Sequence, residues 1–165
     1  MKDFKDKVAV VTGAASGMGL AFAHKFAEEG MSVVLADIEA EALSMAEAAV
    51  KGHGGKVAAL RTNVIVQDDI ERLADAAFNT FGNVHILCNN AGVIAELAPM
   101  GNVADADLTN AVRVGLEAPM RLTAAFLRAT RGWPVPRKVV LVSSGLGRRA
   151  MAGSASYCAA KAGLD

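Results

Sequence analysis

Short apolar runs rich in valine alternate along this chain with longer stretches in which apolar residues recur at helical spacing. Several of the longer stretches are followed by glycine, the residue that most often ends a helix. The predicted strands cover residues 7–11, 32–36, 56–60, 85–88 and 138–142. The predicted helices cover residues 17–29, 39–51, 68–81 and about 105–130, with a bend expected at Pro119, and a last helix begins at Ser154.

This alternation predicts an α/β fold. Strands that are apolar on both faces and alternate with helices indicate a parallel sheet covered on two sides. Right-handed crossovers leave few topologies, and the simplest of them is the doubly wound sheet. The sequence has no internal repeat beyond the alternation and no interdomain linker, so we expect one domain over residues 1–165.

The composition indicates a folded domain without a charged binding surface. Of 165 residues, 53% are apolar and 21% are charged, and the formal net charge is zero. Basic residues are scattered, so we expect neither a nucleic-acid partner nor a membrane surface. No apolar run reaches the roughly 20 residues that cross a bilayer, and the charged residues 1–7 are not a signal peptide. Cys88 and Cys158 lack partners at metal-ligand spacing, which favours reduced thiols and a cytoplasmic location.

The segment Thr-Gly-Ala-Ala-Ser-Gly-Met-Gly at residues 12–19 follows the first predicted strand and opens the first predicted helix. A dinucleotide-binding loop occupies this place in doubly wound folds. Gly13 permits the tight turn, and Gly17 and Gly19 let the backbone approach a pyrophosphate at the helix N-terminus. Glycine turns between strands and helices are common, so the strand–turn–helix context carries the prediction of an NAD(P)-binding Rossmann domain.

Asp37 ends the second predicted strand, where a carboxylate can accept hydrogen bonds from the adenosine ribose hydroxyls. Its charge repels a 2′-phosphate, and no arginine or lysine stands beside it in the sequence. The sequence therefore favours NAD over NADP as the cofactor. The alternative for Asp37 is a solvated turn residue or a helix cap before Ile38.

The glycine spacing Thr-Gly-x-x-x-Gly-x-Gly, followed by Asn-Asn-Ala-Gly at residues 89–92, resembles the classical short-chain dehydrogenase/reductase family. The extended, epimerase-like branch spaces its glycines differently. The resemblance implies that residues 89–92 stabilise the central sheet and line the cofactor site. Asn63 and Val64 take the place of an Asp-Val pair that contacts adenine. The implied cofactor-binding residues are Gly13, Ser16, Gly17, Met18, Gly19, Asp37, Ile38, Asn63, Val64, Asn90, Ala91, Gly92, Tyr157 and Lys161.

Tyr157 and Lys161 are four residues apart on a predicted helix, so their side chains share one face. A lysine ammonium beside a phenol favours the phenolate, which suits proton exchange near neutral pH. Taken alone, a Tyr-x-x-x-Lys pair is more often an exposed helical pair. The resemblance implies Tyr157 as the acid/base, Lys161 as ribose anchor and supporting cation, and Ser144 as the donor that orients the substrate.

Two departures from the family pattern bear on activity. Glycine stands at position 115, where the family usually places an asparagine that holds a water connecting the lysine to bulk solvent. Family members also usually continue for roughly another half of this length, so we expect a C-terminally incomplete, truncated Rossmann fold. The part beyond Lys161 would supply further strands, nicotinamide contacts and the loop that covers the substrate.

Three functional readings follow. The first is an NAD(P)-dependent oxidoreductase that moves hydride between nicotinamide and a small alcohol or ketone, with a homo-oligomer expected. The second is a nucleotide-binding remnant with little or no turnover. The third is a fragment whose complete parent is the enzyme. The residues do not identify the substrate.

A narrower resemblance rests on two segments. Residues 143–148, Ser-Ser-Gly-Leu-Gly-Arg, and residues 116–120, Leu-Glu-Ala-Pro-Met, resemble the sepiapterin reductase/benzil reductase branch. Those enzymes generally favour NADPH, which conflicts with Asp37, and we give the local charge more weight.

No metal site is expected. His24, His53 and His85 are far apart in the strand–helix order and are read as forming no ligand set. Cys158 is next to Tyr157 but points to another helix face.

Overall fold

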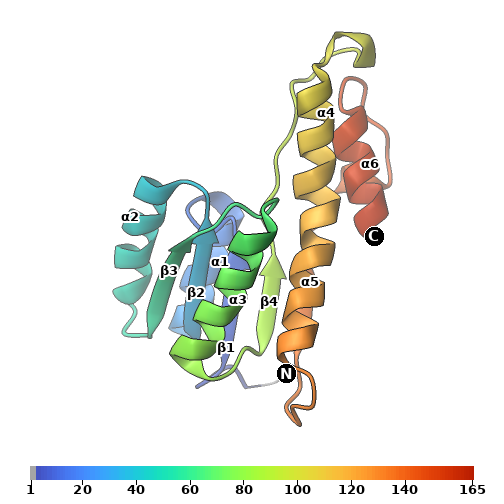
Figure 1. Cartoon of the computed structure of the whole chain (residues 1–165). Coiled ribbons are helices and arrows are strands. Elements are labelled where there is room, and N and C mark those ends of the chain that lie inside the picture. Colours follow the sequence, from blue (N-terminus) through green and yellow to red (C-terminus); the bar gives the residue numbers. More distant parts are fainter. Residues whose placement is uncertain (1–2) are drawn as a thin grey trace.

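The computed structural model describes residues 3–165 and has a five-stranded, fully parallel sheet at its centre (Figure 1). The strand order is β3-β2-β1-β4-β5. The strands are β1 (Val8–Thr12), β2 (Ser32–Asp37), β3 (Val57–Arg61), β4 (Ile86–Asn89) and β5 (Lys138–Leu141). The order reverses at β1, so the predicted doubly wound sheet is confirmed.

Helices cover both faces of this sheet, as strands without a polar face require. The helices are α1 (Gly17–Glu28), α2 (Ala40–Lys51), α3 (Gln67–Phe81), α4 (Asp105–Val112), α5 (Ala118–Ala129) and α6 (Ala155–Leu164). One buried apolar cluster lies between the sheet and α1 and α2. A second lies between the sheet, α3 and α5. Figure 1 shows α3 and the lower part of α5 on the same side of the sheet.

The sequence explains why the central strand is buried. All five residues of β1, Val-Ala-Val-Val-Thr, are buried. The strand is hydrogen-bonded to β2 on one side and to β4 on the other. Burial of three valine side chains contributes roughly 1.5–3 kcal/mol each. The loop that leaves β1 therefore starts from a fixed point.

The predicted bend at Pro119 is wrong in its position. The helical stretch is interrupted by a π-helical turn, Arg113–Glu117, and Pro119 lies in the first turn of α5. Proline has no N–H to donate to the carbonyl four residues earlier, and the N–H of Ala118 instead bonds the carbonyl of Arg113. The π-helical turn connects α4 to α5, and the two helices form one long rod (Figure 1).

The upper end of this rod projects beyond the sheet, with α6 beside α4 (Figure 1). The loop after β4 meets the loop before α6, where the N–H of Ala98 donates to the carbonyl of Gly153 at 3.2 Å. The projecting helices α4 and α6 thus stand at an angle to the carboxyl edge of the sheet. Within residues 3–165 no helix is both long and apolar enough to cross a membrane.

Candidate nucleotide-binding and active site

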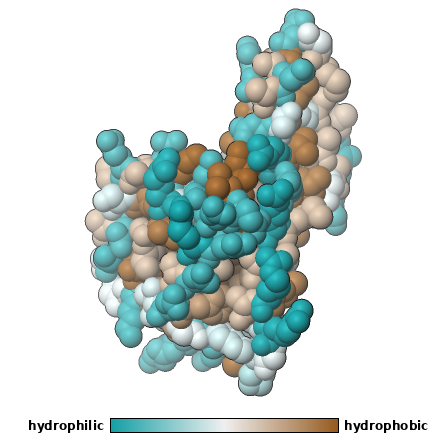
Figure 2. Space-filling model, in the orientation of Figure 1, coloured by the Kyte–Doolittle hydropathy of each residue, from teal (hydrophilic) through white to brown (hydrophobic). Residues whose placement is uncertain are grey.

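A cavity of about 530 Å³ lies at the carboxyl ends of β1, β2, β4 and β5. This is the edge where doubly wound sheets bind their ligands. Figure 2 shows hydrophobic residues among hydrophilic ones at the corner between the sheet layers and the projecting helices. The predicted cofactor residues that line the cavity are Gly13, Ser16, Gly17, Met18, Asp37, Ile38, Asn63, Val64, Asn90, Ala91, Gly92, Tyr157 and Lys161.

The glycine loop leaves the first turn of α1 open to a ligand. Ser16 precedes the helix without capping it through its side chain, and the first turn has no acidic residue. Gly17 has a φ of +53°, and a Cβ added there meets nothing within 4 Å. The backbone N–H groups of this turn and the positive end of the helix dipole are therefore available to an anion.

Gly19 does not line the cavity. A Cβ at this position would lie 2.0 Å from the carbonyl oxygen of Gly13 and 2.5 Å from Nδ2 of Asn90. Gly19 is therefore needed for the close packing of α1 against the loop, and its role in cofactor binding stays a prediction.

A hydrogen-bond network fixes the loop to the end of β4. Nδ2 of Asn90 donates to the carbonyls of Thr12 at 3.0 Å and Gly13 at 3.1 Å. The backbone N–H groups of Asn90 and Ala91 donate to the Thr12 hydroxyl at 3.1 and 3.2 Å. Asn89 lies in the strand itself, and its Nδ2 donates to the hydroxyl of Thr123 on α5 at 3.2 Å.

Asp37 holds the opposite side of the loop. Its Oδ2 accepts from the N–H of Ala15 at 2.9 Å, and its Oδ1 accepts from the N–H of Glu39 at 3.1 Å. Two carboxylate oxygens provide about four acceptor positions. The side chain can therefore hold the loop and still accept hydrogen bonds from a ligand in the cavity.

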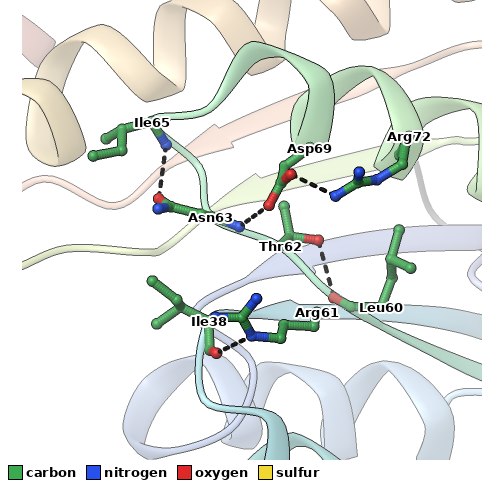
Figure 3. A network of polar contacts seen from close by, with 8 residues as sticks. All are labelled: Ile38, Leu60, Arg61, Thr62, Asn63, Ile65, Asp69 and Arg72. Atoms are coloured by element: carbon green, nitrogen blue, oxygen red, sulfur yellow. Dashed lines mark hydrogen bonds and ion pairs between the residues drawn. The ribbon is translucent and has the colours of Figure 1, made fainter.

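The statement that no arginine stands beside Asp37 is wrong in three dimensions. Asp37 and Arg61 are register partners on β2 and β3. Nε of Arg61 donates to the carbonyl of Ile38 at 3.1 Å (Figure 3). The residues are 24 positions apart in the sequence, so only the parallel pairing of the strands brings them together.

Asn63 is held in a fixed orientation at the next corner of the cavity (Figure 3). Its backbone N–H donates to Oδ2 of Asp69 at 2.8 Å, and its Oδ1 accepts from the N–H of Ile65 at 3.2 Å. Asp69 also pairs with Arg72 on α3. Because the Asn63 oxygen is engaged, its NH₂ group is the part best able to donate to a bound base.

Lys161 and Tyr157 enter the cavity together from α6. Lys161 is 4% exposed, and its Nζ donates to the carbonyl of Val142 at 2.6 Å. The same Nζ lies 5.7 Å from the centre of the Tyr157 ring. Burial lowers the pKa of the Lys161 ammonium, and the charge of Asp165 opposes this effect. The predicted pair on one helix face is therefore also a pair in the cavity.

Ser144 does not line the cavity, whereas Ser143 does. The Ser144 hydroxyl accepts from the N–H of Leu146 at 3.2 Å and caps a short 3-10 turn, Gly145–Gly147. The Ser143 hydroxyl donates to the backbone carbonyl of Lys161 at 3.4 Å. The assignment of Ser144 as the orienting donor stays a prediction, and its hydroxyl would need to leave the cap to fulfil it.

The remaining lining residues were absent from the prediction. They are Thr62, Ile65, Val93, Ile94, Asn110, Val114, Val142 and Ser143. Most of them follow a strand end or neighbour a predicted residue, and that position is the signal that could have found them. Asn110 is different, because it reaches the cavity only through the placement of the α4 rod.

Gly115 is a packing position. It is buried in the π-helical turn, and a Cβ there would lie 3.0 Å from the Cβ of Ala160 on α6. It does not line the cavity. The missing side chain lets α6, which carries Tyr157 and Lys161, approach α4 closely.

The fold and the site together define a doubly wound nucleotide-binding domain with a tyrosine–lysine pair in its cleft. The family described as short chain dehydrogenase matches residues 7–165, and the chain belongs to that family.

Individual relatives also match nearly the whole of this chain. The 1-deoxy-11-beta-hydroxypentalenate dehydrogenase of Streptomyces exfoliatus is 35% identical over 156 residues, which are 94% of this chain and 57% of that enzyme. The structure of an NAD+-bound xylitol dehydrogenase is 28% identical with a TM-score of 0.94, covering 99% of this chain and 62% of its own. A metagenomic short-chain oxidoreductase in complex with NADP is 32% identical with a TM-score of 0.91, covering 98% and 72%. The chain thus spans just over half the length of the Streptomyces exfoliatus enzyme and of its counterpart from Streptomyces arenae.

Proposed function

We propose that this chain binds a nicotinamide dinucleotide at the carboxyl edge of its sheet and contributes the catalytic half of an alcohol–ketone oxidoreductase. One observation carries the proposal. A single cavity brings together the uncapped N-terminus of α1, the Asp37 carboxylate and the Tyr157–Lys161 pair. These groups are suited to a pyrophosphate, a ribose and a reacting hydroxyl respectively.

The residues present fit such a cofactor. Gly17 leaves open space at the end of α1, where a side chain would obstruct a pyrophosphate. The Lys161 ammonium has three N–H groups, of which one donates to Val142. The other two are available to ribose hydroxyls. Asn63 presents its NH₂ group at the corner proposed for adenine.

The chemistry of the bound cofactor is hydride transfer between its nicotinamide ring and a carbon that bears a hydroxyl or carbonyl. The chain's own residues handle the proton. The Tyr157 hydroxyl donates its proton to the carbonyl oxygen in reduction and takes it from the hydroxyl in oxidation. The buried Lys161 ammonium lies 5.7 Å from the centre of the Tyr157 ring, so its positive charge is placed to stabilise negative charge that develops there during the transfer. Ser144 orients the substrate oxygen once its hydroxyl leaves the cap of the 3-10 turn.

We propose NAD rather than NADP as the preferred cofactor. The Asp37 carboxylate lies in the cavity wall and opposes a 2′-phosphate. Arg61, next to Asp37 on β3, acts in the opposite direction, but its guanidinium is held at the carbonyl of Ile38. The neighbouring structures include both an NAD+ complex and an NADP complex, so the preference rests on Asp37.

Further parts of the proposal rest on narrower support. One NAD(P)-binding domain over residues 1–165 is supported by the single sheet. A small alcohol or ketone substrate is supported by the named relatives. A homo-oligomer is supported by the exposed apolar residues of β5, and a cytoplasmic location by two free cysteines. The sepiapterin reductase/benzil reductase branch stays a prediction from residues 116–120 and 143–148.

A second candidate function is nucleotide binding with weak or no turnover. It is favoured by the Ser144 hydroxyl, which caps a turn and does not line the cavity.

The two functions are separated by one pair of assays. Oxidation of NADH is followed by absorbance with a panel of cyclic and linear ketones, and NADH binding is measured on the same sample. Turnover that is lost in Tyr157→Phe supports the enzyme. Binding without turnover establishes the nucleotide-binding function, and absence of binding contradicts both.

A further inference from the structure

Two histidines from different elements meet on the surface. His24 is on α1, and His53 lies in the turn after α2. Nδ1 of His24 is 2.8 Å from Nε2 of His53, and the rings are 5.0 Å apart at an angle of 83°. The expectation that these histidines lie far apart is wrong, because α1 and α2 cover the same face of the sheet side by side.

The separation of the two nitrogens is close to the one that a metal ion requires of neighbouring ligands. Imidazole nitrogens lie about 2.0–2.1 Å from a bound transition metal. Two such ligands at a right angle are therefore about 2.9 Å apart, and two at a tetrahedral angle about 3.3 Å. The observed 2.8 Å fits the right angle best. Right angles are typical of Cu²⁺ and Ni²⁺ with nitrogen and oxygen ligands.

We propose that His24 and His53 form a two-imidazole site for a divalent transition metal, Cu²⁺ or Ni²⁺ in preference to Zn²⁺. In the metal-free neutral pair, one ring donates its N–H to the lone pair of the other. On binding, the donor ring moves that proton to its outer nitrogen, so both facing nitrogens ligate and no proton is released. Water completes the coordination, since residues 3–165 offer no group of three or more His, Cys, Asp or Glu placed to hold a metal.

The charges around the two histidines largely offset one another. Glu28 is one helical turn after His24 and lines the same surface hollow as His53, and it pairs with Lys25 at 3.5 Å. Lys51 pairs with Glu47 at 2.9 Å, and Lys56 also lines the hollow. The two imidazole nitrogens themselves therefore carry the proposed site.

The site is separate from the proposed nucleotide site. Helices in this fold run opposite to the strands, so the turn after α2 lies at the amino edge of the sheet. The cavity that holds Tyr157 and Lys161 lies at the carboxyl edge. A metal here would link α1 to the turn after α2 and stabilise that face of the protein, because it binds the folded state alone.

The test is a calorimetric titration of the full chain with NiCl₂ and with CuCl₂, in a Cys158→Ser background because Cys158 is a free thiol. We expect one equivalent per chain, and at least a tenfold weaker Kd in both His24→Gln and His53→Gln. Thr80→Ser, an exposed and uncharged change in the same hollow, should leave the affinity unchanged. MgCl₂ and CaCl₂ should give no binding.

Two controls keep the result interpretable. Circular dichroism of each variant checks that it is folded, and the melting temperature is measured with and without NiCl₂. The third histidine, His85, is 6% exposed, and its Nδ1 accepts the N–H of Val8. It is therefore left unchanged in all variants. Loss of the nickel-induced rise in both histidine variants supports the site. Nickel and copper affinities in folded His24→Gln and His53→Gln that equal those of the parent, or no saturable binding by the parent chain, overturn it.

Discussion

Lys161 combines a positive charge with almost complete burial. It is 4% exposed, and its ammonium has one protein acceptor, the carbonyl of Val142. Removing a charge from water costs several kcal/mol unless it is paired and hydrogen-bonded. The residue is therefore placed for binding and proton chemistry at the expense of stability.

We predict that Lys161→Met stabilises the ligand-free chain by about 1 kcal/mol or more and weakens NADH binding. In the parent chain, burial lowers the pKa of Lys161. Between that lowered value and 10.5 the unfolded chain therefore binds more protons than the folded one. The stability of the parent therefore rises with pH across this window, while the variant lacks this rise. Urea unfolding at pH 8 and pH 10 measures both effects. A less stable variant at pH 8 would refute the prediction.

Asp37 and Arg61 have opposite effects on cofactor choice. Asp37→Asn keeps an acceptor for the N–H of Ala15 and removes the charge. We expect it to reduce the preference for NADH over NADPH by roughly tenfold, equivalent to about 1.4 kcal/mol. Arg61→Gln in the Asp37→Asn background should weaken the binding of NADPH and leave the binding of NADH unchanged. Fluorescence titrations of the three proteins with NADH and NADPH give the six affinities, and equal binding of both cofactors by the parent chain contradicts the role of Asp37.

At the scale of elements, the approach of α6 to the α4 rod decides where Tyr157 and Lys161 lie. Gly115 and Ala160 meet at this contact. A Cβ added at Gly115 would lie 3.0 Å from the Cβ of Ala160. Such a separation is tighter than side chains normally accept, so a larger residue at 115 moves α6.

We predict that Gly115→Asn, although it introduces the family's usual residue, lowers the melting temperature and does not raise turnover. Its side chain displaces α6 before any water can be held. Gly115→Asn combined with Ala160→Gly should recover part of the lost stability, because the second change removes the methyl group that the new Cβ meets. Thermal unfolding and NADH oxidation by the three proteins measure this. Ordinary turnover in Gly115→Asn alone would contradict it.

The features that the sequence predicts lie within single elements, and those that it leaves open depend on contacts between elements. The glycine loop, the strand ends and the Tyr157–Lys161 pair are local patterns, so sequence spacing was enough to place them. Arg61 beside Asp37 and His24 beside His53 depend on pairing between elements, which no local pattern encodes. The π-helical turn before Pro119 was also missed, because a helical period and one proline fit either a bend or a wider turn.

At the scale of the whole molecule, the outer edge of β5 is open. Within residues 3–165 the strand is hydrogen-bonded to β4 alone, and Val140 and Leu141 are exposed. An open apolar strand is a template for pairing with another chain.

We therefore predict self-association that Val140→Lys weakens. Sedimentation velocity at about 10 and 100 µM should show a concentration-dependent increase for the parent and little for the variant. Met45→Lys, which changes an exposed apolar residue on α2, is the matched control and should behave as the parent. A parent chain that stays a sharp monomer at both concentrations would contradict the role of this edge.

The central claim is that the cavity at the carboxyl edge binds a nicotinamide dinucleotide through the open first turn of α1. The most direct measurement is calorimetric titration of the chain with NADH, beside Gly17→Ala. The added methyl group enters open space in the folded protein but a backbone at φ +53°, so the variant should fold with a small loss of stability. We predict saturable one-to-one binding by the parent and affinity at least roughly tenfold weaker in the variant. No binding by the parent, or equal binding by both proteins, would contradict the account.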